Sequence, residues 1–255
     1  MAKHSEFILT PISGILEEAG AAIGNQSVGI ENYPLKEYLL QTIFLKLTGA
    51  QEQKCKCILW DVATYDYVFR YQKFGARSDI KGECSTIKEK NIIYKSLLRL
   101  VDPTGKGIPS NSICDDAKRE RFIQDAFSHV ARFYLCCSHQ GWSQKEYDDH
   151  IALFSAVTKD KVYYDQLIEG ANQEPDKVSG KLAESYIKAV YNHRNRCAHN
   201  LLSFQGNKPS FNLLRDEFKY WNYYYRFALL ILVDLILSDV YRLWIEKVET
   251  GLYDE

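Results

Sequence analysis

The sequence lacks an excess of positive charge. Its 255 residues include 32 lysines and arginines and 33 aspartates and glutamates, so the formal net charge is −1. Proteins that bind nucleic acid over a broad surface are usually basic. Any role in binding nucleic acid therefore requires a local cationic site rather than a general positive field.

The sequence also lacks a CxxC pair, which argues against a zinc ribbon or zinc finger. Its seven cysteines are an odd number, and the spacing Cys55-x-Cys57 is more typical of core thiols than of a metal site. The N-terminal apolar run is broken by Pro11 and Gly14, which is not typical of a signal peptide. We therefore expect reduced thiols in a cytoplasmic protein, with no metal and no cofactor.

No apolar run is long enough to cross a membrane. The most apolar stretch, FALLILVDLIL, extends from Phe227 to Leu237 and is interrupted by Asp234. A bilayer-spanning helix needs about 20 apolar residues. This stretch therefore predicts a buried core helix, and we expect no membrane partner.

Alternating strand patterns, repeats and low-complexity blocks are not found, whereas helical patterns dominate. We expect one all-α domain over residues 1–255, folded as a helical bundle. The expected helices cover residues 34–49, 52–75, 85–102, 115–138, a segment from Ser143, a short piece in 159–170, 181–199 and 213–248. Gly49 is expected to end the first of these, Ser85 to cap the third, and Ser143 with Glu146 to form a capping box.

The stretch YNHRNRCAHN, residues 191–200, concentrates polar and cationic side chains at the end of an expected helix. Arg194 is followed directly by Asn195, and four residues separate Arg194 from His199. Histidine can move protons near neutral pH, and arginine can hold two phosphate oxygens in a fork. This pair is therefore suited to acid–base chemistry at a phosphate group.

The motif RNRCAHN, with its preceding helix and long following helix, resembles the HEPN family (higher eukaryotes and prokaryotes nucleotide-binding). The likeness is greatest to the abortive-infection and toxin-type branches, and the HEPN-like core is most evident in residues 176–250. The resemblance implies an all-α fold with the motif at the end of the penultimate long helix. It also implies a metal-independent endoribonuclease that acts as a homodimer in antiviral defence or as a toxin, with a possible regulatory or antitoxin partner. Arg194 and His199 would be catalytic, and Asn195 would orient or support them.

Helix geometry adds a constraint on this site. Arg194 and His199 lie about 140° apart on an ideal helix, so one helix presents the pair imperfectly. A frayed helix end, a wrapped arginine, or two copies meeting across a two-fold axis would each resolve this, and the last predicts a composite dimeric site. His193 and Arg196 are expected to add cationic character, and Arg226 to contact RNA from the following helix.

Other interpretations remain open. The spacing from Arg132 to His139 also fits an Arg-x4-6-His pattern, although it reads as a core helix. Glu146 and His150 have metal-ligand spacing without a third ligand, and a solvated capping-box face is the alternative. The motif itself could be a solvated helix end, favoured by the helix dipole. The chain could also be a non-catalytic helical module that binds RNA, a nucleotide or a protein.

Three further segments carry aromatic or basic side chains. The run KYWNYYYRF, residues 219–227, could stack on bases but is more typical of packing or of a dimer contact. The basic segments 118–122 and 70–81 could contact phosphate but are more typical of solvated faces.

Overall fold

A computed structural model describes residues 3–23, 33–74, 83–102, 115–137, 141–162, 165–174, 177–199 and 221–250. Within these ranges all regular structure is helical, so the chain is an all-α helical bundle, as predicted. The α-helices are α1 (Ser5–Leu9), α2 (Gly14–Ile23), α3 (Tyr33–Tyr65), α4 (Tyr67–Phe74), α5 (Ile87–Val101), α7 (Asp116–Cys137), α8 (Gly141–Phe154), α9 (Leu182–Tyr186), α10 (Asn192–His199) and α12 (Tyr223–Glu249). A 3-10 turn covers Lys159–Lys161, and a π-helical segment, Ile187–Tyr191, joins α9 to α10.

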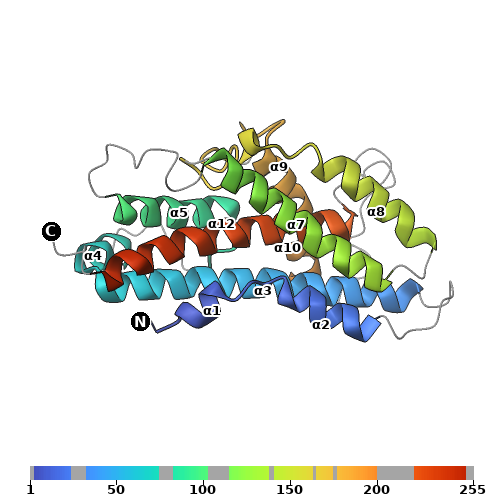
Figure 1. The fold of residues 1–255 in the computed structure, drawn as a ribbon, viewed down its shortest axis with the longest axis horizontal. Helices are drawn as coiled ribbons and strands as arrows, with labels where there is room; N and C mark the ends of the chain where they lie inside the picture. Colours follow the sequence, from blue (N-terminus) through green and yellow to red (C-terminus); the bar gives the residue numbers. More distant parts are fainter. Residues whose placement is uncertain are drawn as a thin grey trace.

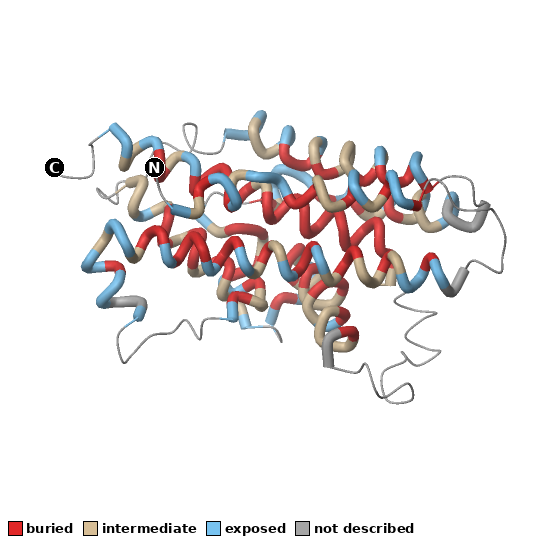
Figure 2. The backbone as a smooth tube through the Cα atoms, turned by 90° about the horizontal axis from the view of Figure 1, so that it is seen from below, coloured by how far each residue is buried: buried red, intermediate tan, exposed pale blue. Residues whose placement is uncertain are grey.

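Helix α12 is the central element of the bundle. It packs against α7, α3, α5 and α8, and Figure 1 shows these helices around it. Its stretch from Tyr223 to Val233 is buried throughout, as is expected of a helix that is apolar on all sides. The buried residues form a continuous band through the middle of the molecule in Figure 2. The prediction that Phe227 to Leu237 is a core helix is therefore confirmed.

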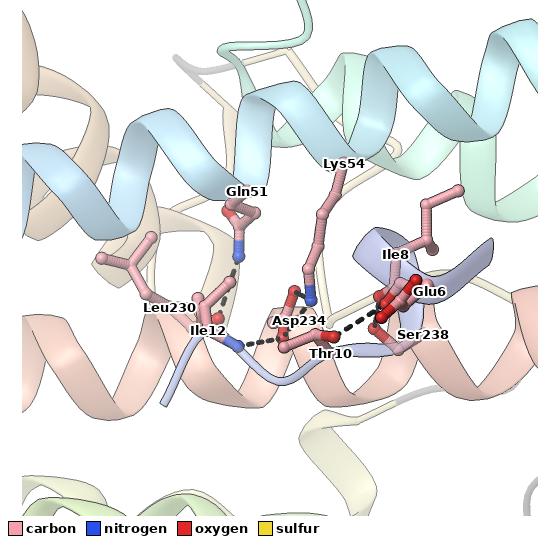
Figure 3. Close-up of polar contacts among 9 residues, drawn as sticks. All are labelled: Glu6, Ile8, Thr10, Ile12, Gln51, Lys54, Leu230, Asp234 and Ser238. Carbon is pink, nitrogen blue, oxygen red and sulfur yellow. Dashed lines mark hydrogen bonds and ion pairs between the residues drawn. The ribbon is translucent and has the colours of Figure 1, made fainter. Parts of the chain in front are cut away.

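Helices α3 and α12 run side by side in the same direction, and polar side chains join them. The Lys54 ammonium lies 2.8 and 3.0 Å from the two carboxylate oxygens of Asp234, and Oδ2 of Asp234 also accepts from the backbone N–H of Ile12 (Figure 3). One turn earlier, Gln51 donates to the carbonyl of Leu230 at 2.9 Å. These bonds set the register of α3 against α12 and so place the residues of α3 that approach α10.

Three boundaries differ from the predictions. Helix α3 continues through Gly49, because packing against α12 outweighs the cost of about 1 kcal/mol for glycine in a helix. The break falls instead at Asp66, between α3 and α4. Helix α5 is capped by Thr86, in a capping box with Glu89, rather than by Ser85.

The remaining elements agree with the predictions in part. Residues 159–170 contain one 3-10 turn where a longer helical piece was expected. Helix α8 begins at Gly141, two residues before Ser143, whose side chain lies outside the described residues. Residues 200–220 also lie outside them. Helix α12 begins at Tyr223, with Asn222 as its extended N-cap, and not at residue 213 as predicted. None of the helices in the described ranges is long and apolar enough to span a membrane.

Candidate functional site

The motif helix α10 follows a π-helical segment, Ile187–Tyr191, without a break in the chain of helical turns. Such wide turns are rare and occur mostly as single turns inside α-helices, often at functional sites. The guanidinium of Arg226 donates through Nε to the carbonyl of Ala189, within this segment, at 2.9 Å. Arg226 therefore ties the start of α12 to the turn that orients α10.

Arg194 lies on the side of α10 that faces α3. Its Nη2 lies 3.0 Å from Oε2 of Glu52, and its Nη1 lies 3.4 Å from Oδ1 of Asn195. The Arg194 side chain keeps 27% of its surface exposed, against 14% for Glu52. The arginine is thus held by a carboxylate from another helix, yet part of its guanidinium remains open to solvent. Asn195 is the second polar neighbour of this guanidinium.

His199 is the last residue of α10, and its side chain lies outside the described residues. The backbone is α-helical from Asn192 to His199, so the helix does not fray between Arg194 and His199. Their backbone positions therefore differ by about 140° around the helix axis, and their Cα atoms are about 7.5 Å apart along it. A frayed helix before His199 is excluded as a way of bringing the pair together.

His193 does not add the expected cationic character. It is 7% exposed, and its ring packs 5.0 Å from that of Phe44. Burial, with Arg226 and Arg196 nearby, lowers the pKa of His193 to about 2, so the ring is neutral at physiological pH. A ligand would have to displace this packing to reach it.

A polar network lies beneath α10. Nε2 of His193 is 3.2 Å from the hydroxyl of Tyr223 and 3.5 Å from Sγ of Cys197. Tyr223 also hydrogen-bonds Glu37 of α3. Burial raises the pKa of the Cys197 thiol, so it stays protonated. The network fixes the inner face of α10 against α3 and α12.

The two other expected substrate contacts, Arg226 and Arg196, pack against aromatic rings. Arg226 is fully buried, 4.7 Å from the ring centre of Tyr223, and burial lowers its pKa to about 10, so it remains charged. The guanidinium of Arg196 lies 4.5 Å from the ring centre of Trp221. Burial places Arg226 out of reach of a substrate. Arg196, which is half-buried, remains near enough to the surface to approach one.

Sequence reasoning missed Glu52. It stands on α3, far from the motif in the chain, and the sequence carries no spacing that links it to Arg194. A small cavity beside this pair, of about 10 Å³, is lined by Glu52, Lys90, Tyr186 and Arg194 among others. A larger groove of about 460 Å³ opens beside the start of α10 and includes Lys88, Lys188, Tyr191 and Asn192. Space for a ligand therefore exists next to the motif helix.

Glu146 and His150 do not form the solvated capping-box face that was the alternative to a metal site, because His150 is buried and Ser143 lies inside α8 rather than at its N-cap. His150 is fully buried, neither ring nitrogen hydrogen-bonds a described residue, and burial lowers its pKa to about 4. Among the described residues no group of three metal-ligating side chains forms. The aromatics Tyr223, Tyr224 and Tyr225 are buried, which confirms that they pack in the core.

The basic groups near the start of α7 lie beside carboxylates, and Asp115 caps the helix. Lys118 lies 2.7 Å from Asp239, and Arg121 lies 3.7 Å from Asp125. Asp115 accepts from the backbone of Lys118 at 2.6 Å, as expected at a helix start. In the rival motif Arg132 is 65% exposed and lies 3.9 Å from Glu17, whereas His139 falls outside the described residues. Each of these cations therefore lies beside a carboxylate, as is typical of a solvated helix face.

No family model matches this chain, and a search of curated proteins and of solved structures gives no significant match. The assignment of a function consequently depends on the geometry around α10.

Proposed function

We propose that this protein is a metal-independent endoribonuclease of the HEPN type. The observation that carries the proposal is the RNRCAH motif on α10, with Arg194 partly exposed and held by Glu52 and Asn195. A fixed, partly solvated guanidinium that contacts a polar neighbour is suited to phosphate, because Arg bonds two phosphate oxygens in a planar fork.

The proposed reaction is an internal transfer at one phosphate. The 2′-hydroxyl attacks the adjacent phosphorus and loses its proton to a base, and the bond from phosphorus to the 5′-oxygen breaks as that oxygen takes up a proton. The products are a 2′,3′-cyclic phosphate and a 5′-hydroxyl. His199 carries one of the two proton transfers, and Arg194 stabilises the charge that develops on the phosphorane.

The proposal includes a homodimer. Because α10 is regular through His199, the backbone positions of Arg194 and His199 in one copy lie about 140° apart around the helix axis. A second copy related by a two-fold axis would supply a histidine to each arginine. Mixing inactive Arg194→Ala with inactive His199→Ala protein should then restore part of the activity, because one composite site in the mixed dimer is intact. Absence of any restoration in verified mixed dimers contradicts a shared site.

The test of the activity is incubation with total RNA, followed by sequencing of 5′-hydroxyl ends. We expect new ends with the wild type, with and without chelator, and none with His199→Ala. Arg132→Ala, in the rival motif, is the matched control and should cut as the wild type does. Full cleavage by His199→Ala would contradict the catalytic role of His199. Loss of cleavage with chelator would contradict a metal-independent reaction.

One observation favours a second function, a non-catalytic module that binds RNA, a nucleotide or a protein. Arg194 is already neutralised by Glu52 at 3.0 Å, and a phosphate would have to compete with that carboxylate. Purified wild-type protein that binds RNA but yields no 5′-hydroxyl ends from any RNA would support this alternative.

A further inference from the structure

Exposed aromatic side chains gather where α3 ends and α4 begins. Trp60 is 63% exposed, Tyr67 78% and Tyr71 73%, and Tyr65 and Phe74 are also exposed. Exposed apolar patches on soluble domains commonly mark interaction sites. In Figure 1, α4 lies at one end of the molecule, reached from α10 along α3.

Part of this surface is hollowed. Trp60, Ala63 and Thr64 of α3 and Arg70 and Phe74 of α4 line a pocket of about 230 Å³. Pockets for drug-sized ligands hold about 300–1,000 Å³, so this one suits a smaller group. Two aromatic rings with a guanidinium between helices are the side chains on which nucleobases stack.

The charge of this surface also favours a polyanion. Among the described side chains of residues 53–74, the exposed charged ones are Lys56 and Arg70, and both are positive. Asp66 is half-buried and accepts from the backbone of Phe69 at 2.8 Å, so it caps α4. This local positive charge stands out in a chain whose net charge is −1.

The surface is continuous with the motif site. Glu52, Lys56 and Trp60 occupy successive turns of α3, four residues apart, which places Trp60 about 12 Å along the axis from Glu52. Glu52 holds Arg194. A strand whose phosphate meets Arg194 can therefore follow the same face of α3, past Lys56, to the pocket at Trp60.

We propose that Lys56, Trp60, Arg70 and Phe74, which we call the α3–α4 track, bind single-stranded RNA by base stacking and phosphate contact. The identity of this RNA as the substrate rests on the proposed function. The track holds unpaired bases on one side of the scissile phosphate. It therefore selects single-stranded RNA over duplex RNA, whose bases are already stacked.

The test measures binding of a short fluorescein-labelled single-stranded RNA of mixed sequence to the full-length His199→Ala protein by anisotropy. Trp60→Ala with Phe74→Ala should weaken binding by about tenfold or more, because base–aromatic stacking is lost. Arg70→Gln should reduce the salt slope by about one phosphate contact. Tyr38→Ala removes an aromatic side chain that is 65% exposed on the opposite part of α3, and should leave binding unchanged.

A second readout reports stacking itself. Addition of the RNA should quench the fluorescence of exposed Trp60, and Trp60→Phe should remove that quench while keeping most of the binding. Duplex RNA of the same sequence should compete poorly. Circular dichroism and the thermal midpoint of each variant, expected to match those of the parent, show that the variants are folded.

Unchanged RNA affinity in the Trp60→Ala, Phe74→Ala variant overturns the track. Loss of self-association in that variant, with RNA affinity retained, overturns it too, because the surface then joins two copies of the chain. The two proposals fail separately. If the wild type binds RNA through the track but does not cleave it, the ribonuclease proposal is wrong and the track proposal stands. If the double variant cleaves RNA with an unchanged KM, the track proposal is wrong and the ribonuclease proposal stands.

Discussion

Helix α3 makes two ion pairs that lie almost side by side in the sequence but in different surroundings. Lys54 points into the core and meets Asp234, with side chains that are 5% and 3% exposed. Glu52 meets Arg194, whose side chain is 27% exposed. The first pair is sealed between α3 and α12, and the second stands where solvent reaches the motif helix.

The difference separates a structural pair from one that can exchange partners. Two charges in the core cannot part, because each would remain buried without compensation. A partly exposed arginine can exchange a carboxylate for a phosphate, since both accept the same forked hydrogen bonds and water screens the charges during the exchange. The comparison therefore identifies Glu52–Arg194 as the pair that a ligand can open.

Breaking the core pair should have the largest effect on stability. Asp234→Ala leaves the Lys54 ammonium buried without a carboxylate and should lower the free energy of unfolding by about 3–5 kcal/mol. Chemical denaturation measures this loss. Lys54→Met combined with Asp234→Leu removes both charges and should recover most of the stability. A loss of unfolding free energy below about 1 kcal/mol in Asp234→Ala would mean that solvent reaches the Lys54–Asp234 pair.

Breaking the outer pair should act on activity instead. Arg194→Ala should lower the cleavage rate about 10²–10³-fold, the usual cost of losing one group that stabilises the transition-state charge. Its free energy of unfolding should change by about 1 kcal/mol or less. Single-turnover cleavage and denaturation of one preparation measure both. A large loss of stability with normal cleavage would reverse the roles of the two pairs.

Acid should lower the free energy of unfolding through two buried histidines. His193 and His150 have pKa values lowered to about 2 and about 4, against about 6.5 in an unfolded chain. Below about pH 6.5 these histidines bind protons in the unfolded chain but not in the folded chain. Their contribution to the free energy of unfolding is therefore complete above about pH 6.5 and is lost as the pH falls. From pH 7 to pH 5 each should cost about 2 kcal/mol of unfolding free energy.

The pH prediction has an internal control. His150→Phe keeps an aromatic ring among Phe127, Tyr147 and Phe154 but cannot bind a proton. Denaturation at the two pH values should then show about half the original drop. An unchanged drop in this variant would exclude His150 as a source of the acid sensitivity.

The smallest expected effect comes from neutralising the partner of Arg194. Glu52→Gln keeps an acceptor near the guanidinium but removes the charge that competes with phosphate. RNA should bind about two- to five-fold more tightly, which corresponds to the strength of a partly exposed ion pair. Anisotropy with the His199→Ala background measures it. Weaker binding would show that Glu52 serves to position Arg194 and does not compete with RNA.

The sequence predicted the fold class well because helical periodicity is a local property. The end of α5 at Asp102 and the core helix around Phe227 followed from turn residues and apolar runs. The expected stop at Gly49 was wrong, because long-range packing against α12 decides whether a helix continues there.

The candidate site was predictable only in part. The pattern RNRCAH points to α10, but the burial of His193 and Arg226 depends on rings from α3 and α12 that meet only in the folded chain. The contact with Glu52 joins residues 142 positions apart. Such partners lie beyond what spacing within one segment can show.

The most direct test of the central claim uses an RNA cleaved by the protein and the same RNA with a single 2′-deoxy residue before the scissile phosphate. The account predicts single-turnover cleavage of the first to a 2′,3′-cyclic phosphate and a 5′-hydroxyl, no cleavage of the second at that bond, and loss of the first reaction in Arg194→Ala and His199→Ala. Equal cleavage of both RNAs would contradict attack by the 2′-hydroxyl, and with it the assignment of the motif on α10.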